Sequence, residues 1–96
     1  MKYKILWLIQ SVSDMQRIRE YIDQFDLDAG YRIANELYAS TGRLAEMPRM
    51  FAEYNRITAL RRMVVGDYSI FYRIDEEKKI VKIEKIRHHY EDSSSV

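Results

Sequence analysis

The fold is decided by residues 63–75, which read MVVGDYSIFYRID from Met63 to Asp75. Side chains on both sides of Gly66-Asp67 alternate with the period of two that is typical of β-strands. A two-residue loop with glycine in first position favours a type II′ hairpin turn. The second arm carries large side chains at both alternating positions, so we expect it to be a central strand. The stretch therefore predicts a β-hairpin.

A third strand is predicted over residues 79–86, after a turn at 75–78. Its apolar and charged residues alternate, and it leads directly into Arg87, His88, His89 and Tyr90. Strands joined by turns this short pair with their neighbours in the chain. We therefore expect an antiparallel meander.

The residues before the meander predict one strand and the first of two helices. Residues 2–9 are rich in β-branched and aromatic side chains, and serines follow them. Ser13 and Gln16 have the spacing of a helix capping box, and Ser11 with Asp14 is a weaker alternative. Apolar residues then recur at helical spacing, which predicts a buried stripe of Val12, Met15, Ile18, Ile22 and Phe25.

A second helix is predicted from a cap at Asp28 to about Met47, where Pro48 stops it. Gly42 within it should cost about 1 kcal/mol relative to alanine. Its buried stripe comprises Ile33, Leu37, Thr41 and Leu44. Two helices joined by a short connection usually lie antiparallel, as a helical hairpin.

The predicted fold class is α+β: an N-terminal strand, an antiparallel helical hairpin and a three-stranded antiparallel meander. We expect the hairpin to cover one face of a mainly antiparallel sheet. A chain of 96 residues has room for one domain. We assign that domain to residues 1–92 and expect residues 93–96 to form a flexible polar tail.

Composition narrows the function. The chain has no cysteine, which excludes disulfides and thiolate zinc sites. Its apolar run from Ile5 to Ile9 is too short for a membrane span or a secretory signal, so we expect a cytoplasmic protein without a membrane partner. The net charge is only +1. Nucleic-acid contact would therefore need a local patch, and residues 43–73 offer one with six arginines and three acids, a net charge of +3.

The segment from Arg87 to Tyr90 concentrates groups that could perform chemistry. RNA cleavage through the 2′-hydroxyl needs a base, an acid and a cation. In that interpretation His89 is the base or acid, Arg87 holds the phosphate and Tyr90 stacks or positions. The alternative is a polar strand end without a catalytic role. Adjacent histidines on a strand point to opposite faces, so we expect no metal and no cofactor.

Arg61 and Arg62 should also point to opposite faces of their strand, so that only one lines any groove. The alternative is that both are exposed ion-pairing residues. We regard Arg61, Arg73 and His88 as candidate binding residues. The tyrosines between residues 21 and 72 are typical of core edges and interfaces rather than of catalysis.

The whole order resembles the RelE/ParE toxins of bacterial type II toxin–antitoxin systems. The similarity rests on Val65-Gly66-Asp67-Tyr68, on Tyr72-Arg73, on the final strand ending at His88, and on the segment from Leu44 to Pro48, LAEMP. The resemblance implies a β-α-α-β-β-β fold, a growth-arresting toxin and a cognate antitoxin as partner. The sequence leaves open whether the free chain forms a homodimer.

The resemblance implies two targets, DNA gyrase or the ribosome with its messenger RNA. Ser69 and Val64 stand where ribonuclease members often carry basic residues, which favours the gyrase-directed branch. Against this, His89-Tyr90 is similar to the terminus of YoeB-like ribonucleases, with Arg62 as a second catalytic cation. His88 can also be aligned with the family histidine. A third alternative is an inactive or regulatory domain that only binds its antitoxin.

Overall fold

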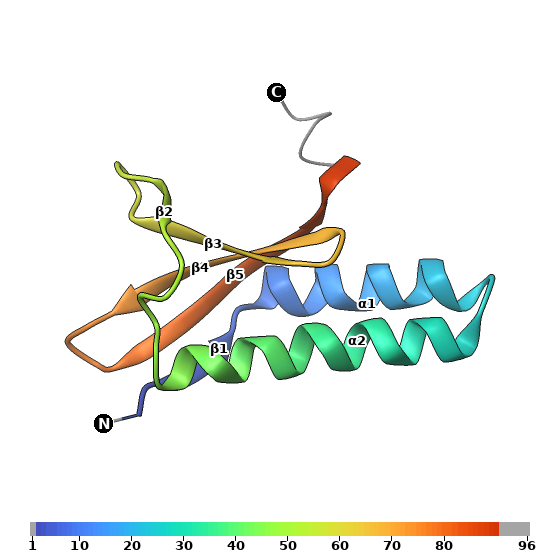
Figure 1. Ribbon diagram of the computed structural model, residues 1–96, viewed down its shortest axis with the longest axis horizontal. Coiled ribbons are helices and arrows are strands. Elements are labelled where there is room, and N and C mark those ends of the chain that lie inside the picture. Colours follow the sequence, from blue (N-terminus) through green and yellow to red (C-terminus); the bar gives the residue numbers. More distant parts are fainter. Residues whose placement is uncertain (1, 91–96) are drawn as a thin grey trace.

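The computed structural model describes residues 2–90, and within them one five-stranded sheet has the order β1-β5-β4-β3-β2. Strand β1 (Lys4–Trp7) runs parallel to β5 (Ile80–His88), whereas β5, β4 (Tyr68–Asp75), β3 (Leu60–Val65) and β2 (Glu53–Asn55) pair antiparallel. Figure 1 shows helices α1 (Ile9–Asp23) and α2 (Leu27–Gly42) side by side along one face of the sheet. The predicted α+β fold class is therefore confirmed.

The predicted meander is confirmed in β3, β4 and β5, and β4 is a central strand. Gly66 has a φ of +58°, a conformation that a residue without a Cβ adopts at little cost. Strand β2 was not predicted, because all three of its residues are exposed and show no apolar alternation. The loop carrying β2 projects from the face of the sheet opposite the helices (Figure 1). The predicted tail at 93–96 lies outside the described residues.

The predicted start of the first helix at Ser13 is wrong, because α1 begins at Ile9. The amide of the preceding residue, Leu8, donates to the Ile83 carbonyl. Ser11 lies inside α1, where its hydroxyl donates to the Leu8 carbonyl, and the N-cap residue is Leu8 rather than Ser11 or Ser13. The buried face of the helix also differs from the predicted stripe. Ser11, Asp14 and Ile18 are buried, whereas the predicted core residues Val12 and Phe25 are 50% and 73% exposed.

The second helix follows its prediction more closely. Leu37, Thr41 and Leu44 are buried and Ile33 packs against the core, as the stripe predicted. The cap, however, is Asp26 rather than Asp28: its carboxylate accepts a hydrogen bond of 3.1 Å from the Ala29 amide. Helix α2 ends at Gly42, and a 3-10 turn, η1 (Arg43–Ala45), carries the chain to the segment before Pro48.

The hydrophobic core lies between the helices and the inner face of the sheet. It is built mainly from strand residues with less than one-tenth exposure, against which Ile18 and Leu37 pack from the helices. The Tyr72 side chain is fully buried within it and donates a hydrogen bond of 2.7 Å to the Pro48 carbonyl. Neither helix within residues 2–90 is long and apolar enough to cross a membrane.

Candidate functional site

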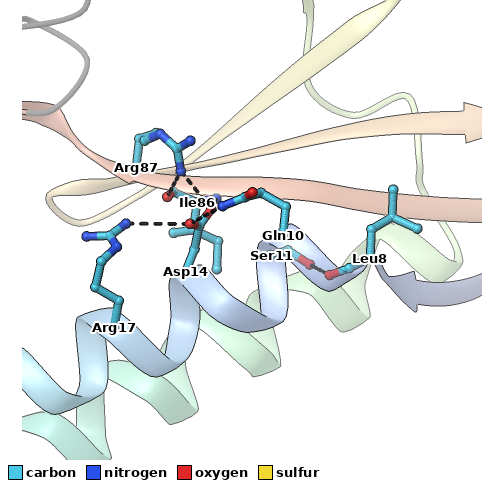
Figure 2. Close-up of polar contacts among 7 residues, drawn as sticks. All are labelled: Leu8, Gln10, Ser11, Asp14, Arg17, Ile86 and Arg87. Carbon is cyan, nitrogen blue, oxygen red and sulfur yellow. Dashed lines mark hydrogen bonds and ion pairs between the residues drawn. The ribbon is translucent and has the colours of Figure 1, made fainter.

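The end of β5 is fixed to α1 by one buried carboxylate, that of Asp14 (Figure 2). Strand β1 pairs with β5 only as far as Ile83, so the outer edge of β5 beyond that point lies beside α1. Asp14 Oδ2 accepts a hydrogen bond of 3.0 Å from the Ile86 amide. The side chain of Asp14 thus replaces a neighbouring strand as acceptor.

The same carboxylate holds the first of the predicted site residues. Arg87 Nη1 lies 2.7 Å from Asp14 Oδ2 and also donates to the Ile86 carbonyl. The other oxygen, Oδ1, accepts from Gln10 Nε2 at 2.9 Å and lies 3.6 Å from Arg17 Nη2. A buried charge is tolerated when it is paired and hydrogen-bonded, and Asp14, only 3% exposed, meets both conditions. Arg87 is therefore oriented toward α1.

His88 and Tyr90 form an aromatic cluster on the helix side of the same strand end. Their rings are stacked at 5.4 Å with an interplanar angle of 2°, and the His88 ring meets Tyr68 edge-on at 5.1 Å. His88 Nδ1 accepts the Tyr90 amide hydrogen. These residues line a cavity of about 590 Å³ together with Arg17, Ile18 and Tyr21 of α1. The cavity combines an imidazole, phenols and a guanidinium.

His89 is directed differently from His88. Its ring centroid is 6.4 Å from that of His88, and its backbone amide donates to the Asp67 carbonyl at the β3–β4 turn. His89 is not among the residues that line the cavity. The structure thus brings His88, rather than His89, together with Tyr90.

Arg62 lies on the outer face of the sheet, opposite α1 and α2, and no helix of residues 2–90 covers that face. Its Nε donates a hydrogen bond of 2.8 Å to Ser69 Oγ, and its Cζ lies 5.6 Å from the centroid of Tyr54. On the same face Lys85 Nζ lies 5.1 Å from the centroid of Phe71, which meets Tyr54 edge-on at 5.1 Å. Two cations and two aromatic rings from β2, β3, β4 and β5 therefore meet on this face.

The remaining binding candidates have partners within the chain. Arg61 Nη1 donates to the Phe51 carbonyl at 2.6 Å, so it anchors the loop before β2. Arg73 Nε lies 3.1 Å from Glu84 Oε2 on the adjacent strand. As predicted, Arg61 and Arg62 diverge, and only Arg62 joins the outer-face cluster.

Sequence reasoning missed Asp14, Tyr54 and Lys85. For Asp14 a signal was available, because it lies four residues before Ile18 on the face that α1 buries. A carboxylate on a buried helical face requires a partner on the element it packs against. Tyr54 and Lys85 lie far apart in sequence, and only the pairing of the strands between them brings them close.

Known proteins share both sequence and fold with this chain. Residues 5–93 match the family described as the ParE toxin of the type II toxin–antitoxin system parDE. The toxin RelE2 of Caulobacter vibrioides is 32% identical over 85 residues, which cover 88% of this chain and 93% of that toxin.

Two solved structures share the fold. That of the chromosomal ParDE system from P. aeruginosa has a TM-score of 0.77 at 12% identity, covering 91% of this chain and 96% of that one. A mutant of the E. coli toxin RelE in the free state has a TM-score of 0.72 at 14% identity, covering 99% and 92%. The fold is thus that of the RelE/ParE toxin superfamily. Within it, the chain belongs to the ParE toxin family of type II toxin–antitoxin systems.

Proposed function

We propose that this toxin arrests growth by inhibiting DNA gyrase, without hydrolysing a substrate, and that a cognate antitoxin neutralises it in the cytoplasm. The observation that carries the proposal is the Asp14–Arg87 ion pair. An arginine that holds a substrate phosphate must direct its guanidinium at that phosphate. Arg87 would have to leave Asp14 to do so, and breaking a buried ion pair leaves a charge uncompensated. The arginine at the predicted catalytic segment is instead held against α1.

The directions of the other predicted catalytic groups support the same proposal. Acid–base cleavage requires the base, the acid and the cation to reach one phosphate. Arg62 lies over Tyr54 on the outer face, whereas Tyr90 stacks on His88 beside α1. Arg87 is the cross-strand partner of Ser69, which Arg62 contacts, but its guanidinium is turned to Asp14 at the edge of β5. Membership of the ParE toxin family also favours the gyrase-directed branch.

The test measures both the supercoiling activity of gyrase and the integrity of messenger RNA. Purified chain is added to gyrase and relaxed plasmid, and the same chain is induced alone in a bacterial host while abundant messages are followed by primer extension. We expect supercoiling to be blocked, messages to stay intact and added antitoxin to restore activity. Normal supercoiling by gyrase at saturating toxin would overturn the proposal. His89→Ala is a matched variant, because it should retain gyrase inhibition but would abolish cleavage by a ribonuclease that uses His89.

One observation favours the ribosome-dependent ribonuclease as a second function. The cavity beside α1 brings His88, Tyr90 and Arg17 together, which supplies an imidazole near a cation. In that mechanism His88 would transfer the proton and Arg17 would hold the phosphate. Cleavage of translated messages that His88→Ala abolishes, without loss of folding, would establish it. Absence of any growth defect from the folded chain would instead indicate a regulatory domain that binds only its antitoxin.

A further inference from the structure

The turned end of the helical hairpin projects beyond the sheet (Figure 1). Residues 20–31, here called the hairpin tip, comprise the end of α1, the turn at 24–26 and the start of α2. Exposed apolar residues scattered singly are normal, but a group of them bordered by polar residues marks an interaction site. Four large apolar side chains of the hairpin tip are more than half exposed: Tyr21, Phe25, Leu27 and Tyr31. The Tyr21 and Phe25 rings are in contact, edge-on at 5.5 Å.

The hairpin tip is held in one conformation by contacts of its own. Arg19 Nε donates to both carboxylate oxygens of Asp23, at 3.0 and 3.1 Å. A Cβ at Gly30 would collide with that carboxylate, so glycine at this position allows the two helices to approach closely. The Asp26 carboxylate accepts from the Ala29 amide and fixes the start of α2. A preformed surface of this kind loses less conformational entropy on binding than one that must first become ordered.

The border of the hairpin tip is acidic. Residues 20–31 contain four acids and neither lysine nor arginine, a net charge of −4: Glu20, Asp23, Asp26 and Asp28. Among the ion pairs of residues 2–90, only Asp23 of these four takes part, with Arg19. A symmetric dimer would bring the same charge to both sides of one interface, which like charges oppose. The charge therefore favours a different partner, one whose surface is apolar and basic.

We propose that the hairpin tip is the surface by which this toxin docks on DNA gyrase, with Phe25 and Leu27 in an apolar groove that cations of the enzyme border. This inference rests on the proposed inhibition of gyrase and adds the contact surface to it. An enzyme that holds DNA presents basic surfaces, because binding to DNA depends on neutralising its phosphates. The acidic border of the hairpin tip is complementary to such a surface, and its exposed rings supply the apolar contacts that dominate the energy of interfaces.

The apolar contacts are tested with purified gyrase and the full chain. Binding is measured by biolayer interferometry, supercoiling is assayed on the same preparations, and circular dichroism verifies that each variant is folded. Phe25→Ser and Leu27→Ser should each weaken binding at least about tenfold and weaken inhibition in parallel. Ile57→Ser is the matched control, since Ile57 is 96% exposed in the loop between β2 and β3 and should bind like the parent chain.

The acidic border is tested with two charge reversals on α2. Asp28→Lys should lower the association rate about fivefold at low salt, and the loss should fade as salt is raised. Glu36→Lys makes the same charge change about two turns further along α2, outside the hairpin tip, and should lower the rate less than about twofold. Equal losses in the two variants would overturn the inference, because the attraction would then depend on total charge. This pair still decides if a serine variant fails to fold.

Failure of the inference and failure of the proposed function have different results. If the parent chain binds and inhibits gyrase but Phe25→Ser and Leu27→Ser do so equally well, the inference fails and the proposed function stands. If the parent chain does not bind gyrase, both fail.

Two other occupants of the hairpin tip would also overturn the inference. A second copy of the chain is indicated if the parent forms a dimer that Phe25→Ser dissociates while gyrase binding persists. The antitoxin is indicated if Phe25→Ser and Leu27→Ser lose antitoxin binding and keep gyrase binding.

Discussion

The guanidinium of Arg87 lies 2.7 Å from the carboxylate of Asp14, which is 73 residues earlier in the chain and only 3% exposed. This pair joins the second turn of α1 to the end of β5, at the edge that no longer pairs with β1. It therefore fixes the position from which His88, His89 and Tyr90 project.

We predict that Asp14→Ala destabilises the chain by about 3–5 kcal/mol, because it removes the partner of a largely buried guanidinium and leaves the Ile86 amide without its acceptor. Urea unfolding followed by circular dichroism gives the free energy. Glu46→Ala is the control, since its pair with Lys2 is solvent-exposed and should contribute less than about 1 kcal/mol. Equal losses in the two variants would contradict a special role for Asp14.

The meander and α2 could be predicted from the sequence because their signals are local. Val65 and Tyr68 flank a two-residue turn, and the stripe from Leu37 to Leu44 repeats within one helix. The start of α1 could not be predicted, because a contact with Ile83 determines where β1 ends. The parallel pairing of β1 with β5 joins strands that are far apart in the sequence, and no local pattern encodes which distant strand β1 pairs with.

The candidate site, like the fold, could be predicted from the sequence only in part. The sequence identified Arg87, His88 and Tyr90 as neighbours at a strand end, and they lie there. It could not give their directions, since Arg87 is oriented by Asp14 and the His88 ring by Tyr68 and Tyr90. Those directions distinguish a catalytic cluster from a structural one.

We predict that Ala59→Gly stabilises the chain by about 0.5–1 kcal/mol. Ala59 has a φ of +58°, where a Cβ is unfavourable and glycine is not, so the gain should outweigh the added entropy of the unfolded chain. Thermal unfolding of the purified protein measures the change. Ala39→Gly at an exposed position of α2 should instead destabilise by about 1 kcal/mol. A loss of stability in Ala59→Gly would show that the alanine conformation is not strained.

The stability of the fold should depend on pH in the acid range because of Glu76. Hydrogen bonding from the Tyr3 hydroxyl, together with the ion pair to Arg49, lowers the pKa of Glu76 below its usual range. A lowered pKa in the folded state stabilises the fold above the unfolded pKa, and this contribution is lost as pH falls through the folded value. Glu76→Gln should therefore flatten stability against pH in the acid range, measured by urea unfolding from neutral pH downward. Glu77→Gln, its exposed neighbour, is the control and should keep the slope of the parent chain.

The stability of the fold should depend on pH in the alkaline range because of Tyr72. Burial raises the pKa of its phenol above the usual value of 10.0, although the nearby Arg61 acts in the opposite direction. A raised pKa in the folded state means that the contribution is fully present below the unfolded pKa and is lost as pH rises through the folded value. We therefore expect the chain to lose stability above about pH 10, where the unfolded phenol ionises.

Tyr72→Phe isolates this effect. It removes the hydrogen bond to the Pro48 carbonyl and should cost about 1 kcal/mol at neutral pH. Between the parent and the variant, the difference in unfolding free energy should then shrink as pH rises past 10 and change sign if ionisation of the buried phenol costs more than the hydrogen bond contributes. Tyr31→Phe, at an exposed ring on α2, is the matched control. A constant difference between the parent chain and Tyr72→Phe across the alkaline range would show that burial of this phenol does not couple its ionisation to folding.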